Sequence, residues 1–444
     1  MTESEVRPVV ATAPIGLAPG AQSMPRVATA AFVGSTIEFY DFFLYGTAAA
    51  LVFGKTFFPA LGSAAATAAS FATLGVAFVA RPVGALIFGH LGDRLGRKRT
   101  LVATLLMMGV ATILVGLLPT AGKIGVLAPV ILVVLRILQG IAAGGEWAGA
   151  ALFTVENAPA DKRGFWGMFP SLGGGAALIL GGAAFLATDL SMSQEAFVSW
   201  GWRIPFLASA VLVVIGFWIR FRTEEPKVFS DAVKRSGTAR LPVAEAFRRQ
   251  PREILLATGT VVMVPTFTYI GSSYLTSYGT SVLHLGFTSV LWVAILGGAT
   301  ISAGIVVGAV LSDRVGRRRV IICAAAVAVA WSLMLFPILN TGSVGAFALG
   351  AGVTMFLSGV AYGPMGAYLP ELFQTRYRYT AAGFSYSFAQ IIGGAVPPLI
   401  AAAVIAAYGS VVFSLILAAF CLLSLCCVSV LRESRATALT DVFP

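Results

Sequence analysis

Charge is scarce in this sequence. Only 11% of its 444 residues are Asp, Glu, Lys or Arg, while 58% are hydrophobic; ordinary soluble domains carry about 25% charged residues. A chain with so little charge cannot cover a water-exposed surface, which excludes a soluble enzyme. The composition instead indicates a membrane protein, in which each helical span uses about 20 apolar residues.

Cysteine and histidine are also rare, with four and two copies. Cys323, Cys421, Cys426 and Cys427 all lie in apolar runs with no histidine nearby. This pattern supports neither a disulfide framework nor a zinc site. We therefore expect no metal and no cofactor, and the absence of a His, Cys or paired-carboxylate constellation argues against an enzyme.

The beginning of the chain does not read as a signal peptide. Four prolines interrupt the first 26 residues, which have no basic start and no unbroken apolar centre. We interpret residues 1–26 as a disordered cytoplasmic tail.

Long apolar segments, separated by Gly, Pro or charge, make up most of the remaining chain. They are residues 28–53, 66–91, 100–118, 124–155, 165–188 and 202–221, followed by 254–283, 288–311, 320–339, 344–369, 380–408 and 410–431. Each is long enough to span a bilayer as a helix. The sequence therefore predicts an all-α membrane protein with twelve transmembrane helices.

The basic residues are distributed asymmetrically about these segments. Of the 30 Lys and Arg residues, 25 fall on one side of the membrane, whereas only Lys55, Lys123 and Arg203 fall on the other. By the positive-inside rule, both termini and the long middle loop are cytoplasmic, which fits a multi-pass protein of the plasma (inner) membrane. The positive charge is spread over loops and does not form a patch, so no nucleic-acid partner is expected.

An internal repeat divides the chain into halves. The stretch Gly92–Arg99 (GDRLGRKR) recurs as Ser312–Arg319 (SDRVGRRR), an offset of 220, and Glu156 and Glu371 follow the fourth span of each half. Two features at nearly one offset predict two similar six-helix bundles that rock about a midplane site. We place the bundles at 27–221 and 254–431, a cytoplasmic linker at 222–253 and a cytoplasmic tail at 432–444.

These loops resemble the signature of the major facilitator superfamily. Further stretches resemble its metabolite:proton symporter group. They are Gly34–Gly46 (GSTIEFYDFFLYG), Arg81–Gly84 (RPVG), Arg136–Trp147 (RILQGIAAGGEW), Trp200–Phe206 (WGWRIPF), Tyr362–Pro364 (YGP) and Arg378–Tyr379.

The resemblance implies the major facilitator fold and transport of a small polar metabolite. Members of the group resemble transporters of citrate, 2-oxoglutarate, shikimate, proline and betaine. This chain has Ser171 where the resemblance leads us to expect glutamine. The resemblance therefore indicates the kind of solute but not which one.

Ionisable residues inside the spans are candidates for function, because each costs at least about 2.5 kcal/mol to insert at mid-bilayer. Glu38 and Asp41 share a face of the first helix, and the resemblance to proton-coupled sugar transporters implies that Asp41 pairs with Arg136. We assign proton coupling to Asp41, Arg136 and Glu38. The alternative is a static ion pair that holds two helices together.

Arg81 lies near the midplane of the second span and leaves two interpretations open. Its guanidinium suits an anionic substrate, or it pairs with Glu38 or Glu146 and serves packing. Hydroxyl and ring groups of the second half supply further candidates. The expected substrate-binding residues are Arg81, Tyr45, Arg136, Tyr274, Tyr362 and Gln390.

The charged loop residues are expected to form ion pairs that close the cytoplasmic side in one conformation. This expected gate comprises Asp93, Arg94, Arg97, Arg99, Glu156, Arg163, Asp313, Arg314, Arg317, Glu371 and Arg378. The alternative is that these charges only set the topology.

The sequence thus predicts a proton-coupled symporter that imports an organic acid or a zwitterionic osmolyte by alternating access. The alternative is a facilitator or a proton-driven exporter of the same fold. Its expected partners are a small-molecule substrate, protons and the lipid bilayer, and we expect a monomer.

Overall fold

The structure is a computed structural model that describes residues 23–95, 97–144, 146–222, 242–374 and 377–435. Within these ranges, the side chains of residues 89–101, 219–222 and 242–245 are not described. Every regular element in the described ranges is a helix.

The first half contains the helices that begin at Met24 and end at Arg222. They are α1 (Met24–Ala48), η1 (Ala49–Phe53), α2 (Gly54–Phe57), α3 (Ser63–Leu95), α4 (Arg97–Leu117), α5 (Ala121–Ile124), α6 (Leu127–Ala143), α7 (Glu146–Asn157), η2 (Ala160–Lys162), α8 (Arg163–Gly167), α9 (Phe169–Leu190), α10 (Gln194–Ala196), η3 (Phe197–Gly201) and α11 (Arg203–Arg222).

The second half begins at Pro242 and ends at Val430. Its helices are α13 (Pro242–Arg249), α14 (Pro251–Val261), α15 (Met263–Tyr269), η4 (Ile270–Tyr274), α16 (Leu275–Ser281), α17 (Phe287–Val315), α18 (Arg317–Leu339), α19 (Val344–Leu372), α20 (Arg378–Ala389), η5 (Gln390–Ala395), α21 (Val396–Tyr408) and α22 (Ser410–Val430).

Helices occupy all twelve apolar segments, as the sequence predicts. Among the described residues, ten helices or continuous helical runs are long and apolar enough to cross a membrane. An eleventh candidate span, the sixth along the chain, is bent by 53° between Gln194–Gly201 and Arg203–Trp218. The remaining segment, the third along the chain, holds the shorter apolar helix Val102–Leu117. The sixth span thus begins earlier than expected and is broken near Trp202.

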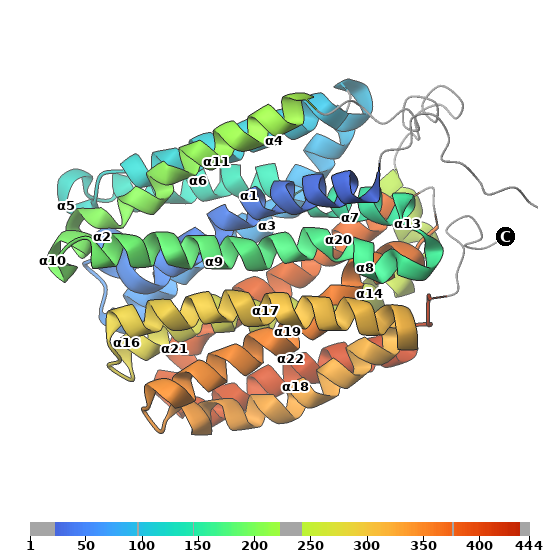
Figure 1. Cartoon of the computed structure of the whole chain (residues 1–444). Helices are drawn as coiled ribbons and strands as arrows, with labels where there is room; N and C mark the ends of the chain where they lie inside the picture. The colour runs from blue at the N-terminus through green and yellow to red at the C-terminus, as the bar shows by residue number, and fades with distance from the viewer. Residues whose placement is uncertain (1–22, 96, 145, 223–241, 375–376, 436–444) are drawn as a thin grey trace, which may run out of the picture.

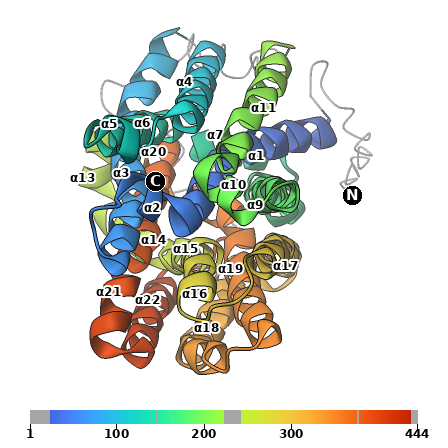
Figure 2. The ribbon, with the colours of Figure 1, turned by 90° about the vertical axis from the view of Figure 1, so that its left-hand side faces the viewer.

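The two halves of the chain form two groups of helices that lie side by side (Figure 1). The blue-to-green helices α1 to α11 lie on one side and most of the yellow-to-red helices lie on the other, an arrangement also seen when the molecule is turned (Figure 2). The exception is α20, which reaches the first half and contacts α3 and α7. Across the boundary, α9 packs against α17 and α3 packs against α21. We call the end that carries α8, α13 and Asp313 the basic end, and the end that carries α5, α10 and α16 the opposite end.

Within each half, glycine allows two helices to approach closely. The helices are the second and fourth spans of that half. A Cβ atom on Gly140 of α6 would collide with the backbone carbonyl of Ala77 on α3. In the same way, a Cβ atom on Gly308 of α17 would collide with the carbonyl of Val360 on α19. Small residues permit such contacts between membrane helices, where packing rather than water exclusion holds helices together.

Short π-helical segments interrupt the first span of each half. They are Ala49–Phe53 and Ile270–Tyr274, which begin 221 residues apart, close to the offset of the sequence repeat. Two more are Phe197–Gly201, in the bent sixth span, and Gln390–Ala395, which interrupts the eleventh span. Because a π-helical turn shifts the side chains that follow it around the helix axis, these segments change which residues face the centre of the molecule.

The expected polar regions are only partly described. Residues 1–22, 223–241 and 436–444 lie outside the described ranges. In the expected linker at 222–253, α13 and the start of α14 are helical.

Candidate functional site

A buried ion pair lies inside the first half of the molecule. Nη1 of Arg136 on α6 is 3.3 Å from Oδ2 of Asp41 on α1, and the two residues are 0% and 3% exposed. Thr112 of α4 donates a hydrogen bond to Oδ1 of Asp41. The structure therefore brings together the two residues that the sequence analysis assigned to coupling.

Gln139 bridges both members of this pair. Its Nε2 donates to Oδ1 of Asp41 at 2.6 Å, and its Oε1 accepts from Nη1 of Arg136 at 2.5 Å. Gln139 lies three residues after Arg136, so both side chains leave the same face of α6. This spacing and the place of Gln139 in the stretch Arg136–Trp147 were its signals in the sequence, but Gln139 was not predicted as a site residue.

Aromatic rings cover the two buried arginines. The guanidinium carbon of Arg136 is 3.6 Å from the ring centre of Tyr45, and that of Arg81 is 4.0 Å from the ring centre of Phe42. Among the described residues, Nε and Nη2 of Arg81 have no hydrogen-bond partner. The Tyr45 hydroxyl is hydrogen-bonded to Thr73 at 2.6 Å.

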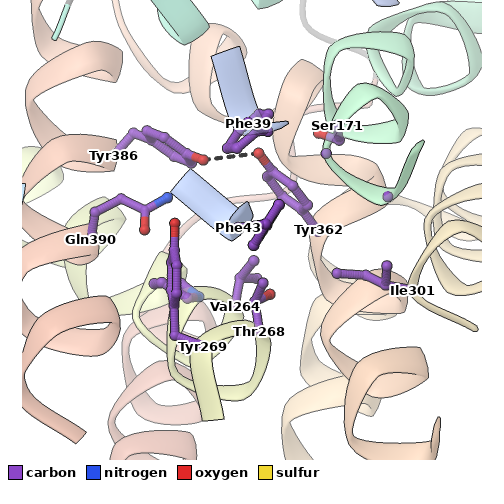
Figure 3. Close-up of a pocket in the computed structure, with 13 residues that line it drawn as sticks. Phe39, Phe43, Ser171, Val264, Thr268, Tyr269, Ile301, Tyr362, Tyr386 and Gln390 are labelled. Carbon is purple, nitrogen blue, oxygen red and sulfur yellow. Dashed lines mark hydrogen bonds between the residues drawn. The ribbon is translucent and has the colours of Figure 1, made fainter. Parts of the chain in front are cut away.

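A central cavity lies between the two groups of helices (Figure 3). Its walls come from both halves and are formed by Phe39, Phe43, Ser171, Gly174, Gly175, Val264, Pro265, Thr268, Tyr269, Ile301, Tyr362, Tyr386 and Gln390. The centre of a water molecule can occupy only about 20 Å³ of this cavity. In this conformation the cavity therefore has room for one or two waters and not for a metabolite.

Polar groups of the cavity wall point toward one another in Figure 3. The hydroxyls of Tyr362 and Tyr386 are hydrogen-bonded at 2.9 Å. The Tyr269 hydroxyl and Oε1 of Gln390 are buried and have no hydrogen-bond partner among the described residues. Unpaired buried polar groups are costly and mark a place where a polar ligand can supply the missing bonds.

The ring of Trp147 packs against two tyrosines of the cavity wall. The ring of Trp147 on α7 lies 3.8 Å from that of Tyr386, with planes 9° apart, and 6.4 Å from that of Tyr362. The rings come from helices of both halves, so the stack joins the two groups of helices.

The structure separates the expected substrate-binding residues into two groups. Tyr362 and Gln390 form part of the cavity wall. Arg81, Tyr45 and Arg136 lie instead around Phe42, outside the wall.

Tyr274 also lies outside the cavity wall. Its ring packs against Phe71 of α3 at 6.3 Å, Tyr278 at 6.1 Å and Phe413 of α22 at 5.8 Å. The sequence analysis missed the wall residues Tyr269 and Tyr386, although Tyr386 lies one turn before Gln390.

Asp41 is not a wall residue of the central cavity. Its carboxyl group borders a second crevice, together with Tyr40 and Ile37 of α1, Leu105, Met108, Gly109 and Thr112 of α4, and Ser209, Leu212 and Val213 of α11. A water centre can reach about 10 Å³ of this crevice, and no wall residue is common to the two cavities. Phe39 and Phe43, on the same helix as Asp41, do line the central cavity, and the charge of Glu38 acts on Tyr269 and Tyr362.

Charged residues at the basic end form a network within the second half. Nη1 of Arg317 lies 3.0 Å from Oδ1 of Asp313, and its Nε lies 3.2 Å from Oε2 of Glu371, which is fully buried. This network joins the start of α18 to the ends of α17 and α19.

The same network reaches across to the first half. The carboxylate of Asp313 accepts hydrogen bonds from the backbone N–H groups of Gly164 at 2.9 Å and Phe165 at 2.8 Å. Nη1 of Arg163 lies 4.0 Å from Oε1 of Glu371. These contacts hold the two halves together at the basic end.

Residues 431–435, here the C-terminal strap, complete the network and were not predicted to take part. The carboxylate of Glu433 accepts from the backbone N–H groups of Arg317 at 2.9 Å and Arg318 at 3.1 Å, which satisfies the start of α18. The Ser434 hydroxyl donates to Oε2 of Glu371 at 2.5 Å.

The remaining residues of the expected gate differ in their positions. The charge of Arg378 acts on those of Glu156 and Glu371. The Arg314 side chain is exposed and forms no ion pair with a described residue, although its carbonyl accepts a hydrogen bond from Arg435. The side chains of Asp93, Arg94, Arg97 and Arg99, at the junction of α3 and α4, are outside those that the structure describes.

The two halves also contact each other at the opposite end. Thr288 of α17 donates a hydrogen bond to Oδ2 of Asp189 on α9 at 2.8 Å. Beside it, the rings of Phe197 and Phe287 lie 5.1 Å apart. Contacts between the halves are therefore present at both ends of the molecule in this conformation.

No group of three or more His, Cys, Asp or Glu side chains in the described part of the chain is arranged to hold a metal ion.

Comparison with known proteins gives matches over most of the chain. The family model of the Major Facilitator Superfamily matches residues 31–397. The inner membrane metabolite transport protein YhjE of Escherichia coli (strain K12) is 41% identical over 93% of this chain and 95% of its own length. The shikimate transporter of the same organism is 38% identical over 92% of this chain and 95% of its own.

A more distant relative and a solved structure extend the comparison. The proline/betaine transporter of Salmonella typhimurium is 32% identical over 85% of this chain and 77% of its own length. A partially occluded inward open structure of the xylose transporter XylE from E. coli matches with a TM-score of 0.72 at 15% identity, over 94% of this chain and 99% of that one. The latter likeness supports the fold alone.

Proposed function

The chain belongs to the Major Facilitator Superfamily, and we propose that it imports a small polar metabolite together with protons by alternating access. That it is a multi-pass membrane transporter, and not an enzyme, follows from the family and from its relatives. The observation that carries the finer proposal is the buried pair of Asp41 and Arg136 on two helices of one half.

The pair is proposed to couple transport to protons because its stability depends on the charge of Asp41. Removing one partner of a buried ion pair costs about 3–5 kcal/mol, since the other charge is left uncompensated. Taking up a proton on Asp41 therefore weakens the hold of α1 on α6. At about 100 mV, each positive charge carried inward supplies about 2.3 kcal/mol.

Coupling is proposed to pass through α1 and not through direct contact of substrate with Arg136. Asp41 and Arg136 are not wall residues of the central cavity, whereas Phe39 and Phe43 of α1 are. Loss of the ion pair between Asp41 and Arg136 is proposed to move α1, which carries the two wall residues Phe39 and Phe43. Proton and substrate then favour the same conformation, which is symport by linkage.

We propose that the central cavity binds the solute after it widens. Hydroxyl and amide groups of Tyr269, Tyr362, Tyr386 and Gln390 offer hydrogen bonds, and the aromatic rings offer an apolar surface. This combination suits an organic acid with hydroxyl groups or a zwitterionic osmolyte, and the names of the relatives include shikimate, proline and betaine.

The contacts at the two ends are proposed to act as alternating gates. At the basic end, Asp313, Glu371 and Arg163 join the halves; at the opposite end, Asp189 and Thr288 do so. By the positive-inside rule we assign the basic end and both termini to the cytoplasm of a plasma membrane.

The test is uptake into energised membrane vesicles with labelled shikimate, proline and glycine betaine as probes. Asp41→Asn is expected to abolish uncoupler-sensitive accumulation and to leave exchange of solute across the membrane, because the neutral side chain mimics the protonated state. Glu195→Gln, at an exposed acid, is the matched control and is expected to accumulate solute normally. Concentrative uptake by the Asp41 variant would refute the coupling. Wild-type uptake that only equilibrates the solute across the membrane and does not respond to the uncoupler would favour a facilitator.

A further inference from the structure

Gln139 is the residue that contacts both charges of the buried pair. Its Oε1 lies 2.5 Å from Nη1 of Arg136, closer than the 3.3 Å between that nitrogen and the Asp41 carboxylate. Its Nε2 donates to Asp41 at 2.6 Å and lies 3.0 Å from the hydroxyl of Thr112. Gln139 is completely buried.

We infer that Gln139 is a positioning residue for proton coupling, whose amide oxygen holds the Arg136 guanidinium when Asp41 takes up a proton. The inference rests on the proposed function, because it presumes that Asp41 is the group that is protonated. A buried guanidinium that loses its carboxylate needs another acceptor. Gln139 supplies a neutral one that is already in contact and does not depend on pH.

Thr112 completes the arrangement because its hydroxyl has two acceptors. It donates to Oδ1 of Asp41 and also lies 2.9 Å from the carbonyl of Met108. When Asp41 becomes neutral, a new O–H bond forms on Oδ1 and this group can donate to Thr112, whose own proton turns to Met108. The Asp41 carboxyl group, the Thr112 hydroxyl and Nη1 of Arg136 then keep a partner in both charge states.

Other charged and titratable groups surround Asp41 without replacing this role. Among the described residues, those that act on Asp41 or on Arg136 are Tyr40 and Tyr45 of α1, Arg81 of α3 and Tyr269 of α15, in addition to the pair itself. α4 and α11 contribute only uncharged crevice residues, such as Thr112 and Ser209. None of these groups is an acceptor within hydrogen-bond distance of the Arg136 guanidinium in the described contacts.

The test measures directly the pH at which Asp41 is neutral. Dicyclohexylcarbodiimide reacts with the neutral form of buried carboxyl groups, and peptide mass spectrometry of the full-length protein in membranes reports modification of Asp41 as a function of pH. Gln139→Leu removes the acceptor of the neutral state, while the ionised state keeps Thr112 and Arg136 as donors. Half-modification is therefore expected at least one pH unit lower than in the wild type.

Gln139→Glu tests the opposite direction. It keeps an acceptor for Arg136 and places a second negative charge beside Asp41, so half-modification is expected at least one pH unit higher. Gln194→Leu, at an exposed glutamine of α10, is the control and is expected to match the wild type.

Each result decides the question. Opposite shifts of the two Gln139 variants support the inference. Two unchanged profiles would overturn it, and a shift of both variants to higher pH would assign Gln139 the role of a donor to the carboxylate alone, which also overturns it. Because labelling needs no solute, failure of the proposed function appears separately, as concentrative uptake by Asp41→Asn.

Discussion

The hydroxyl of Tyr269 is a polar group that the described protein leaves without a partner inside the cavity. Tyr269→Phe therefore removes no hydrogen bond of the protein itself. We expect the KM for uptake of an accepted solute to rise about tenfold, which corresponds to the loss of about 1.4 kcal/mol of binding, with little change in thermal stability. Transport kinetics and the melting temperature of the purified protein provide the measurement.

Tyr278→Phe is the matched control for this prediction. The Tyr278 hydroxyl donates to Asn340 at 2.6 Å, and the residue is not part of the cavity wall. Its loss should lower the melting temperature and leave the KM unchanged. An unchanged KM in Tyr269→Phe would remove that hydroxyl from the recognition of the solute.

At the residue scale, the pairing of charges was easier to predict than the position of a ring. A lone acid and a lone base inside apolar spans require a partner, and the structure brings Asp41 and Arg136 together as expected. Tyr274 was expected to bind substrate, but it packs among other rings. A tyrosine packs well both in a cavity wall and in the core. Its spacing along a helix therefore does not decide between the two positions.

At the scale of helices, close packing makes a prediction about glycine. A Cβ atom on Gly140 would collide with the backbone of α3, whereas one on Gly345, near the start of α19, would meet nothing within 4 Å. We expect Gly140→Ala to destabilise the protein by about 1–3 kcal/mol, because neither helix backbone can yield locally.

Gly345→Ala serves as the control and should be neutral or stabilising by up to about 1 kcal/mol. Thermal unfolding in detergent, followed by loss of the monodisperse peak in size-exclusion chromatography, compares the two variants. Equal stability of both would contradict the close approach of α3 and α6.

The orientation of each helix about its own axis was the property least predictable from the sequence. Spans such as α19 are apolar on every side, so no amphipathic stripe indicates which face turns inward. The π-helical segments also shift the side chains that follow them, and hydropathy carries no sign of such a segment. The number and order of the spans were predictable, whereas the cavity wall needed the structure.

At the scale of the whole molecule, the contacts at the two ends favour different conformations. Glu371→Gln weakens the contacts of this residue with Arg163 and Arg317 and leaves the Asp189–Thr288 contact at the other end intact. We expect the basic end to open more often, because about 1.4 kcal/mol changes a two-state population ratio tenfold.

A cysteine at cavity residue 171 provides the measurement. In a background with the four native cysteines replaced by serine, Ser171→Cys should react about five to ten times faster with a membrane-impermeant maleimide applied from the basic end when Glu371→Gln is present. The same cysteine with Glu195→Gln is the control. An unchanged rate would show that Glu371 does not hold this end closed.

The large-scale plan was predictable from the sequence, because length, apolar runs and the repeated loop constrain it strongly. The C-terminal strap was not, since Glu433 and Ser434 act only through contacts with α18 and α19, which lie far away along the chain. Long-range capping of this kind leaves no local pattern.

The small size of the central cavity has a consequence for the cell that contains this transporter. A membrane crossed by a continuous water-filled path would discharge its voltage through every copy of the protein. Here the central cavity has room for only one or two waters, and contacts between the halves lie at both ends, so this conformation favours an insulating bilayer over a wide aqueous pore.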